Sequence, residues 1–299
     1  MALVQTPLGK TVNGARRWIR LPGGLSLQPA EFTKIAVILF IAYEICLFGQ
    51  KAKKWDGIKI LLGYGLVATL GVFLLTDNLS TAIIVFAIPT AITPATNGFV
   101  FGCTTKIKMH VIANTIIAVG IVGIIGIILL KYTLAESDNF RMRRIIAWLN
   151  PEANADTDSY QFLQGLYAIG SGGFFGKGLG NSTQKLHAIP EAQNDMILAV
   201  ICEELGVFGA IIILCLFAFM LYRLLFIARN APDLYGALIA TGIFAHIALQ
   251  VTLNIGVVTG MLPTTGVTFP FISYGGTAIV ILLAEMGIAL GISSKIRLK

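Results

Sequence analysis

The sequence predicts an all-α integral membrane protein, folded as a polytopic bundle of helices. Of its 299 residues, 56% are hydrophobic and only 12% are charged, and its mean hydropathy is +0.81. Because so few polar side chains cannot cover a water-soluble protein of this length, a lipid bilayer must solvate much of the chain. Long apolar stretches also recur along the sequence, each close to the ~20 residues that a helix needs to cross a bilayer.

Seven stretches are apolar and long enough to be membrane spans. We expect them at residues 32–48, 58–75, 80–101, 110–131, 196–227, 235–258 and 272–292. The segment between the fourth and fifth spans, residues 132–195, is polar, aromatic and rich in glycine. We therefore treat residues 1–299 as a single membrane domain with one large loop.

Lysine and arginine in the short loops predict the orientation of the chain, because these residues resist translocation. They follow the first, third, fifth and seventh spans, whereas the loops after the second and sixth spans contain none. The charged loops should be cytoplasmic, which makes residues 1–31, 132–195 and 259–271 extracellular. The remaining Lys and Arg residues then give the outer face a basic character that suits an anionic ligand.

An extracellular N-terminus requires an explanation under this topology. Residues 1–10 lack the basic and apolar regions of a signal peptide that would carry them across the membrane. We therefore expect an odd number of spans to precede this sequence in a longer protein.

Cysteine spacing indicates neither a disulfide framework nor a zinc site. No C-x-x-C pair occurs among the four cysteines, Cys46, Cys103, Cys202 and Cys215. We also expect no nucleic-acid partner.

Four polar patches fall on the predicted outer face, and the first lies within residues 13–34. One interpretation is that Arg16, Arg17 and Lys34 anchor the protein at the membrane surface. The other is that these cations hold a phosphate-bearing ligand, since arginine binds phosphate in a bidentate geometry. Glu31 and Lys34 are three residues apart, so they should share one helix face.

The second patch is the glycine-rich stretch at residues 170–180, which surrounds Lys177. Ser171 and Gly178 break the spacing of a nucleotide P-loop. Two interpretations stay open. The stretch is either a flexible backbone whose N–H groups and lysine meet a ligand, or a tight re-entrant turn packed on the helices.

The third patch ends at Asp195, directly before the predicted span at residues 196–227. The dipole of that helix would favour a carboxylate at its N-terminus, so Asp195 is a candidate general base for a hydroxyl proton. The alternative is a structural role as the helix N-cap. Four further acids lie inside spans, where each is either a structural hydrogen-bonding group or part of a polar pathway: Glu44, Glu203, Glu204 and Glu285.

The fourth patch, residues 254–278, contains too many Pro and Gly residues for an uninterrupted helix. Irregular backbone at a membrane face has to line protein or a cavity.

Together these strings resemble the SEDS family of shape, elongation, division and sporulation proteins, which includes FtsW, RodA and SpoVE. The resemblance rests on residues 13–19, 28–34, 160–180, 190–206 and 254–278. It is closest to the FtsW and SpoVE branch. It implies a ten-span helical membrane protein whose third span precedes the Asn-Gly-Ala-Arg-Arg-Trp string, so three spans would come before the seven found here.

The resemblance implies a peptidoglycan glycosyltransferase that polymerises lipid II. The 4-hydroxyl of one sugar attacks the anomeric carbon of another, with inversion, and undecaprenyl diphosphate is released. Asp195 aligns with the catalytic aspartate, although its neighbours Gln193, Asn194 and Met196 differ from the family's His-Thr-Asp-Phe. The substrate-binding residues that the resemblance implies are Arg16, Arg17, Glu31, Lys34, Lys177 and Ser273.

The resemblance also implies a cofactor, partners and a location. It implies a divalent cation, Mg²⁺ or Mn²⁺, although no ligand set is legible in the sequence. It implies a class B penicillin-binding protein as a transpeptidase partner, with other division or sporulation proteins. The location would be the bacterial cell membrane, with the active site on the extracellular face.

Two other classes of function compete with the glycosyltransferase: a flippase or transporter for the lipid-linked precursor, and a non-catalytic division scaffold. A transporter should carry its decisive charges near the membrane midplane. Here the charged patches lie at the predicted outer ends of helices, which favours the enzyme.

Overall fold

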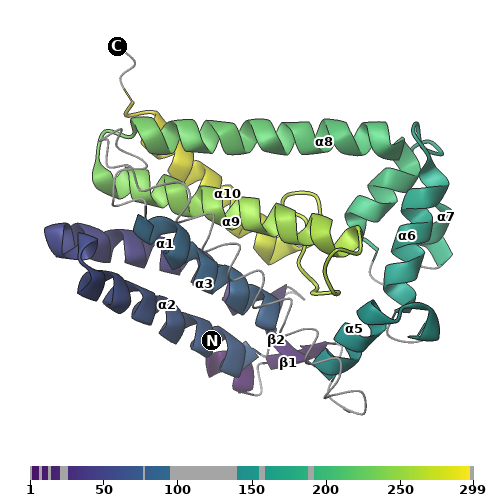
Figure 1. Cartoon of the computed structure of the whole chain (residues 1–299), viewed down its shortest axis with the longest axis horizontal. Coiled ribbons are helices and arrows are strands. Elements are labelled where there is room, and N and C mark those ends of the chain that lie inside the picture. The colour runs from purple at the N-terminus through teal and green to yellow at the C-terminus, as the bar shows by residue number, and fades with distance from the viewer. Residues whose placement is uncertain are drawn as a thin grey trace. The chain divides into compact units, whose positions relative to one another are not determined.

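Helices dominate the computed structural model (Figure 1), as predicted. It describes residues 2–6, 9–12, 15–20, 26–76, 78–94, 140–154, 159–187 and 192–296. The chain forms two compact units. Unit 1 comprises residues 1–103, 213–252 and 266–299, and unit 2 comprises residues 104–212 and 253–265.

The α-helices follow the chain with short 3₁₀ turns at Ala2–Gln5, Gly49–Lys53 and Glu152–Asn154. They are α1 (Pro29–Phe48), α2 (Trp55–Thr76), α3 (Leu79–Pro94), α5 (Phe140–Leu149), α6 (Tyr160–Gly172), α7 (Thr183–His187), α8 (Ile197–Asn230), α9 (Leu234–Val258) and α10 (Gly276–Ser293).

Five of the predicted spans are confirmed as apolar helices long enough to cross a membrane: α1, α2, α8, α9 and α10. The third predicted span begins as α3, whose described part is shorter. The rest of that span and all of the fourth, residues 110–131, lie outside the described residues. The total of seven spans and the extracellular position of the long loop therefore stay predictions.

Residues near the N-terminus form strands, which the all-α prediction did not include. Strands β1 (Gly9–Val12), β2 (Ala15–Arg20) and β3 (Ser26–Leu27) make an antiparallel sheet in the order β1-β2-β3. Asn13-Gly14 between the first two strands is a hairpin signal, and the β-branched and aromatic residues that flank it favour strands. The sheet precedes α1, which begins at Pro29, a residue suited to the first turn of a helix.

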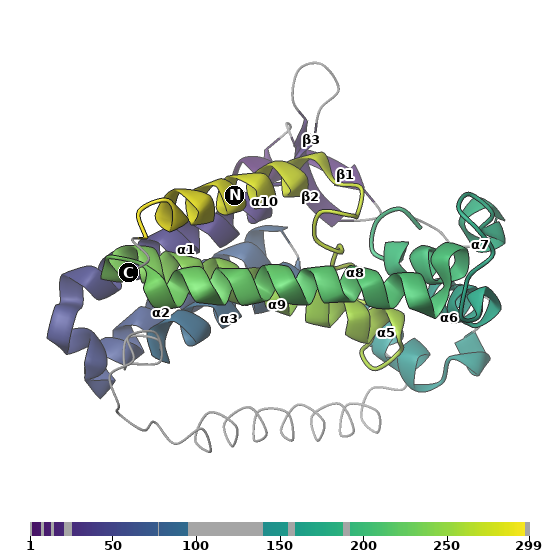
Figure 2. The same cartoon turned by 90° about the horizontal axis from the view of Figure 1, so that it is seen from above.

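Helix α9 is the most buried of the apolar spans, because 67% of its most apolar stretch of 18 residues is buried inside the protein. In unit 1 its Gly242 lies so close to Ile38 of α1 and Ile92 of α3 that a Cβ there would come within 2.7 and 2.9 Å of them. His246 of α9 and Glu285 of α10 are fully buried, and their side chains lie 2.9 Å apart. Glu285 is therefore a structural partner of α9. Figure 2 shows the same helices from above.

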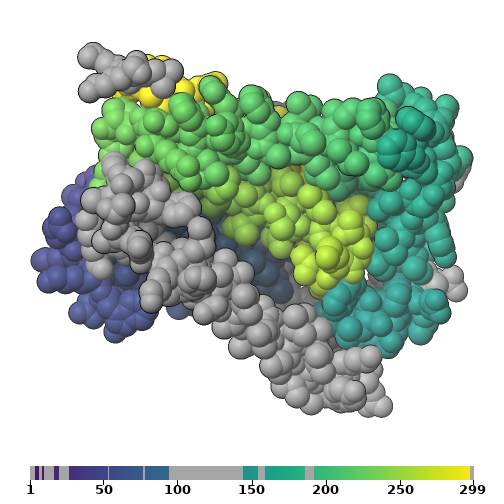
Figure 3. Space-filling model, turned by 45° about the horizontal axis from the view of Figure 1, so that its top comes forward, coloured from purple at the N-terminus to yellow at the C-terminus, as the bar shows by residue number. Residues whose placement is uncertain are grey.

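Helix α8 is broken near its start. Gly206 has φ 70° and ψ −176°, which is not helical. Residues 207–230 alone would be about 36 Å long at 1.5 Å per residue, enough to cross a hydrocarbon core of about 30 Å. Large apolar side chains of this part, among them Ile211, Leu216 and Phe219, are exposed, and Figure 3 shows α8 on the surface of the protein along its length.

Candidate active site

Asp195 lies in the turn that precedes α8 and is held from two other elements of unit 2. Its Oδ1 accepts a hydrogen bond from Gln161 Nε2 of α6 at 3.1 Å. Its backbone carbonyl accepts one from Nδ2 of Asn254, near the end of α9, at 2.8 Å. Asn254 is fully buried, whereas Asp195 is half-buried. Gln161 thus orients one carboxylate oxygen of a residue that is only half-buried.

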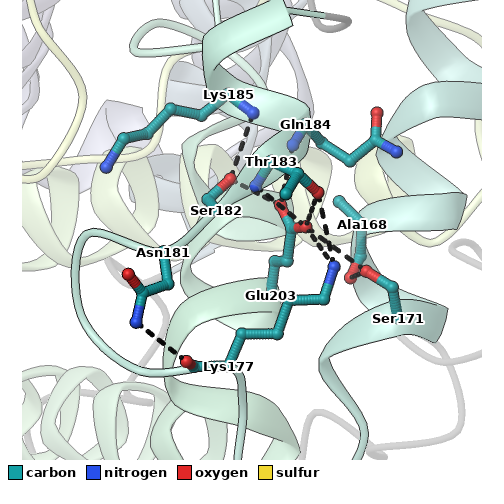
Figure 4. Close-up of polar contacts among 9 residues, drawn as sticks. All are labelled: Ala168, Ser171, Lys177, Asn181, Ser182, Thr183, Gln184, Lys185 and Glu203. Carbon is teal, nitrogen blue, oxygen red and sulfur yellow. Dashed lines mark hydrogen bonds and ion pairs between the residues drawn. The ribbon is translucent and has the colours of Figure 1, made fainter.

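A second polar cluster in unit 2 surrounds Glu203 of α8, which is fully buried (Figure 4). Its Oε1 accepts hydrogen bonds from Lys177 Nζ at 2.7 Å and from Thr183 Oγ1 at 3.0 Å. Its Oε2 accepts from Ser182 Oγ and from the backbone N–H of Gln184. A buried carboxylate is destabilising unless it is paired and hydrogen-bonded. Here the Glu203 carboxylate meets this requirement through hydrogen bonds from the segment between Lys177 and Gln184.

Backbone hydrogen bonds join the glycine-rich stretch to the break in α8. The N–H groups of Lys177 and Gly178 donate to the carbonyls of Glu203 and Glu204, both at 2.9 Å. The N–H groups of Val207 and Phe208 donate in turn to the carbonyls of Gly173 and Phe174, both at 3.1 Å. The stretch therefore supplies partners for groups of α8 that lose their helical partners at the break.

Glycine is required at two positions so that the backbone of the glycine-rich stretch can approach the backbone of α8. A Cβ at Gly206 would lie 2.3 Å from the carbonyl oxygen of Phe174, and one at Gly176 would lie 2.2 Å from that of Glu204. The glycine-rich stretch is thus a tight turn packed on a helix, which decides between the two interpretations of the sequence. The N–H groups of Lys177 and Gly178 are used by α8 and are not free for a ligand.

In unit 1, Glu31 and Lys34 lie on one face of α1, as their spacing predicts, and they form an ion pair. Lys34 Nζ lies 2.7 Å from Glu31 Oε2, and the two side chains are 2% and 9% exposed. Removing only one partner of such a buried pair strongly destabilises the folded protein, because the other charge is left buried and uncompensated. Substrate binding by Glu31 and Lys34 stays a prediction.

Arg17 occupies a special position in the N-terminal sheet. The register passes from Lys10 opposite Trp18 to Thr11 opposite Arg16, so Arg17 is the extra residue of a β-bulge. Bulges bend a strand and redirect a side chain. Arg17 is half-buried, whereas the side chain of Arg16 lies outside the described part of the chain.

Ser273, also in unit 1, is buried and its Oγ accepts a hydrogen bond from the backbone N–H of Phe269 at 2.7 Å. The hydroxyl thus stabilises the turn before α10. Substrate contact by Ser273 stays a prediction.

The structure therefore brings Asp195, Lys177 and Glu203 into one unit, and Arg17, Glu31, Lys34 and Ser273 into the other. Sequence reasoning missed Gln161, because a glutamine in an amphipathic helix has no distinctive pattern. It also gave no role to Asn254, although a polar residue in an apolar span is a usable signal.

The implied divalent cation does not find an obvious site. Among the residues that the structure describes, no group of three or more His, Cys, Asp or Glu side chains is arranged to hold a metal ion. The divalent cation therefore stays a prediction.

Known proteins similar to this chain match it over nearly its whole length. The profile of the FtsW/RodA/SpoVE family, described as "Cell cycle protein", matches residues 1–298. "Stage V sporulation protein E" of Bacillus subtilis is 39% identical, and the match covers 98% of this chain and 75% of that protein. "Probable peptidoglycan glycosyltransferase FtsW" of Trichlorobacter lovleyi is also 39% identical, with 100% of this chain and 74% of that protein covered.

Two solved structures share the fold at 24% sequence identity. One chain comes from "Structural coordination of polymerization and crosslinking by a peptidoglycan synthase complex", with a TM-score of 0.70 over 97% of this chain and 76% of that one. The other is the Thermus thermophilus rod shape determining protein RodA, with a TM-score of 0.60 over 99% of this chain and 76% of that one. With the family profile and relatives well above 30% identity, these matches lead to one conclusion: the chain belongs to the FtsW/RodA/SpoVE family of membrane proteins.

Proposed function

We propose that this protein is a peptidoglycan glycosyltransferase that polymerises lipid II at the outer face of a bacterial cell membrane. The observation that carries the proposal is the position of Asp195 directly before a membrane-spanning helix, with its carboxylate held by Gln161 and its backbone carbonyl held by Asn254. The name of the Trichlorobacter lovleyi relative supports the same activity. The basic outer loops of the predicted topology support an extracellular site.

The proposed reaction is one displacement at an anomeric carbon. Asp195 takes the proton of the acceptor sugar's 4-hydroxyl as the hydroxyl oxygen bonds to the anomeric carbon of the donor. The bond between that carbon and the diphosphate oxygen breaks, and undecaprenyl diphosphate leaves with the electron pair. Attack opposite the leaving group inverts the anomeric centre. Gln161 keeps the carboxylate in position, because its amide N–H donates a hydrogen bond to Oδ1 at 3.1 Å.

Polymerisation in detergent separates this proposal from the flippase alternative. A transporter moves lipid between the leaflets of a closed vesicle and forms no glycosidic bond. We expect purified protein in detergent micelles, where no leaflets exist, to convert labelled lipid II into glycan strands visible on a gel. Absence of strands from an intact, correctly folded preparation would contradict the proposal and favour transport or a scaffold.

Arg17 and Lys177 are the proposed contacts of the leaving diphosphate, on which negative charge builds. We expect Arg17→Ala and Lys177→Ala each to slow turnover more than they lower expression. Arg17→Lys should also be slow, since a compact ammonium does not reproduce a bidentate guanidinium contact. Unchanged rates in both Ala variants would favour the surface-anchor interpretation.

The role of Lys177 needs a matched control, because its Nζ already pairs with the buried Glu203. Lys177→Ala alone leaves that carboxylate without its cation. In the double variant Lys177→Ala, Glu203→Gln the uncompensated charge is gone. If Lys177 contacts the diphosphate, the double variant stays slow, whereas recovery of the rate would assign Lys177 to the pairing of Glu203 alone.

A transpeptidase partner is part of the proposal, because glycan strands have to be cross-linked. We propose a class B penicillin-binding protein with a single membrane span, and other division or sporulation proteins around it. The structure with a TM-score of 0.70 comes from a peptidoglycan synthase complex that coordinates polymerization and crosslinking. We expect the detergent-solubilised protein to co-purify with such a transpeptidase of its own cell. Failure to capture any of them, with full polymerisation in their absence, would contradict this partner.

A further inference from the structure

The turn that packs on the break of α8 carries an exposed apolar tip. Phe174, Phe175 and Leu179 are 56%, 79% and 77% exposed. Phe174 and Phe175 lie edge to face with ring centroids 4.9 Å apart, and both lie beside Phe208 of α8, at 6.1 and 6.3 Å. Clustered exposed aromatic side chains of this kind mark a contact with a membrane or a partner.

The tip is continuous with the apolar surface of a membrane span. Phe208 lies in the first turn of the helix after Gly206, and its N–H donates to the carbonyl of Phe174. Further along the same helix, Ile211 and Ile212 are 48% and 46% exposed. These residues lie within α8, which is apolar and long enough to cross a membrane. The phenylalanines thus extend the surface of α8 that faces the acyl chains, rather than forming a separate patch.

The other side of the same turn is charged. Lys177 pairs with Glu203 at 2.7 Å and Lys185 pairs with Glu204 at 2.6 Å. Both acids precede Gly206 in α8, whereas Phe208, which lies beside Phe174 and Phe175, follows it. Residues 207–230 exceed a hydrocarbon core of about 30 Å by only about 6 Å, so the first turn after Gly206 falls at the boundary between headgroups and acyl chains.

We propose that the tip formed by Phe174, Phe175 and Leu179 is a membrane anchor, which inserts into the lipid at the end of α8 where headgroups meet acyl chains. Aromatic side chains beside lysines are typical of segments that lie in this interface. The occupant is bilayer lipid, because the tip is fixed by backbone hydrogen bonds to a helix that already faces lipid. In consequence, Lys177 is held at the level of lipid phosphates. That this position serves the diphosphate of lipid II is the one step that rests on the proposed function.

Brominated lipids provide a direct test, because bromine quenches tryptophan fluorescence at short range. Phe175→Trp places an indole in the tip, and Asn181→Trp places one on an exposed polar position of the same segment. Each variant is reconstituted in phosphatidylcholine vesicles with bromine near the top of the acyl chains, and the emission of the parent protein's three tryptophans is subtracted. Iodide in the water serves as the second quencher.

We expect the emission added at position 175 to be quenched by brominated lipid roughly twofold or more above that added at position 181, as insertion into the interface requires. Iodide should show the opposite order. Equal quenching by iodide at both positions, with no effect of bromine at position 175, would overturn the proposal. Shielding of position 175 that develops only when a single-span transpeptidase is added would overturn it in favour of a protein partner. Loss of polymerisation would not, because the quenching of a folded, inserted protein is independent of activity.

Discussion

Replacing Asp195 with Asn is expected to lower the rate of lipid II polymerisation by about 10²- to 10⁴-fold, the usual loss when a general base is removed. The amide has nearly the same shape and can keep a contact with Gln161, but it cannot accept the proton of the acceptor hydroxyl. The hydrogen bond from Asn254 goes to the backbone carbonyl of Asp195, so the substitution leaves it in place. Folding and membrane insertion should therefore be retained. The measurement is the initial rate of strand formation by purified protein.

Asp233→Asn is the matched control for Asp195→Asn. Asp233 Oδ2 accepts a hydrogen bond from the N–H of Gly236 at 2.8 Å and so caps the start of α9. Asn caps a helix about as well as Asp, so this change removes a carboxylate with little effect on stability. We expect its rate to match the wild type. A near wild-type rate for Asp195→Asn would exclude Asp195 as the base, and similar losses in both variants would point to a general effect of removing acids.

Gly206→Ala is expected to detach the glycine-rich turn from α8 and to cause a large loss of stability in unit 2. Gly206 adopts a backbone conformation that is essentially restricted to glycine and costs other residues about 1–3 kcal/mol. The new Cβ would also meet the Phe174 carbonyl oxygen at 2.3 Å and the Gly176 nitrogen at 2.4 Å. Because both neighbours are backbone, neither can rotate away, so the turn has to move and its hydrogen bonds to α8 break.

Gly173→Ala separates these two effects. Gly173 has φ 58° and ψ −151°, close to the conformation of Gly206, but a Cβ there would meet nothing within 4 Å. The Gly173→Ala variant should therefore lose only the about 1–3 kcal/mol of stability that the unfavourable backbone conformation costs. We expect thermal unfolding in detergent, and protease cleavage within residues 173–187, to rank wild type, Gly173→Ala and Gly206→Ala in order of decreasing stability. Equal losses in the two variants would show that the close approach contributes nothing.

The positions of the spans could be predicted from the sequence because crossing a membrane is a local property of composition. Helices α1, α2, α9 and α10 begin and end within a few residues of the predicted stretches. The strands β1 and β2 were not predicted, although the sequence contains the Asn13-Gly14 hairpin signal between them. Asp195 was found as a candidate base from its place before a span. The same reasoning offered the N-cap role equally, and only the contacts with Gln161 and Asn254 add support for a positioned carboxylate.

The sequence by itself determined that the chain is a helical membrane protein and where most of its spans lie. It also placed Asp195 and Lys177 outside the spans, in the loop before residues 196–227. Only the tertiary structure decided that α8 breaks at Gly206, that the glycine-rich stretch fills the break, and that Lys177 pairs with Glu203. The physical reason is the distance along the chain between the partners. A hydrogen bond from Lys177 to the carbonyl of Glu203 joins residues 26 positions apart, and no local pattern records which buried backbone group will satisfy which other.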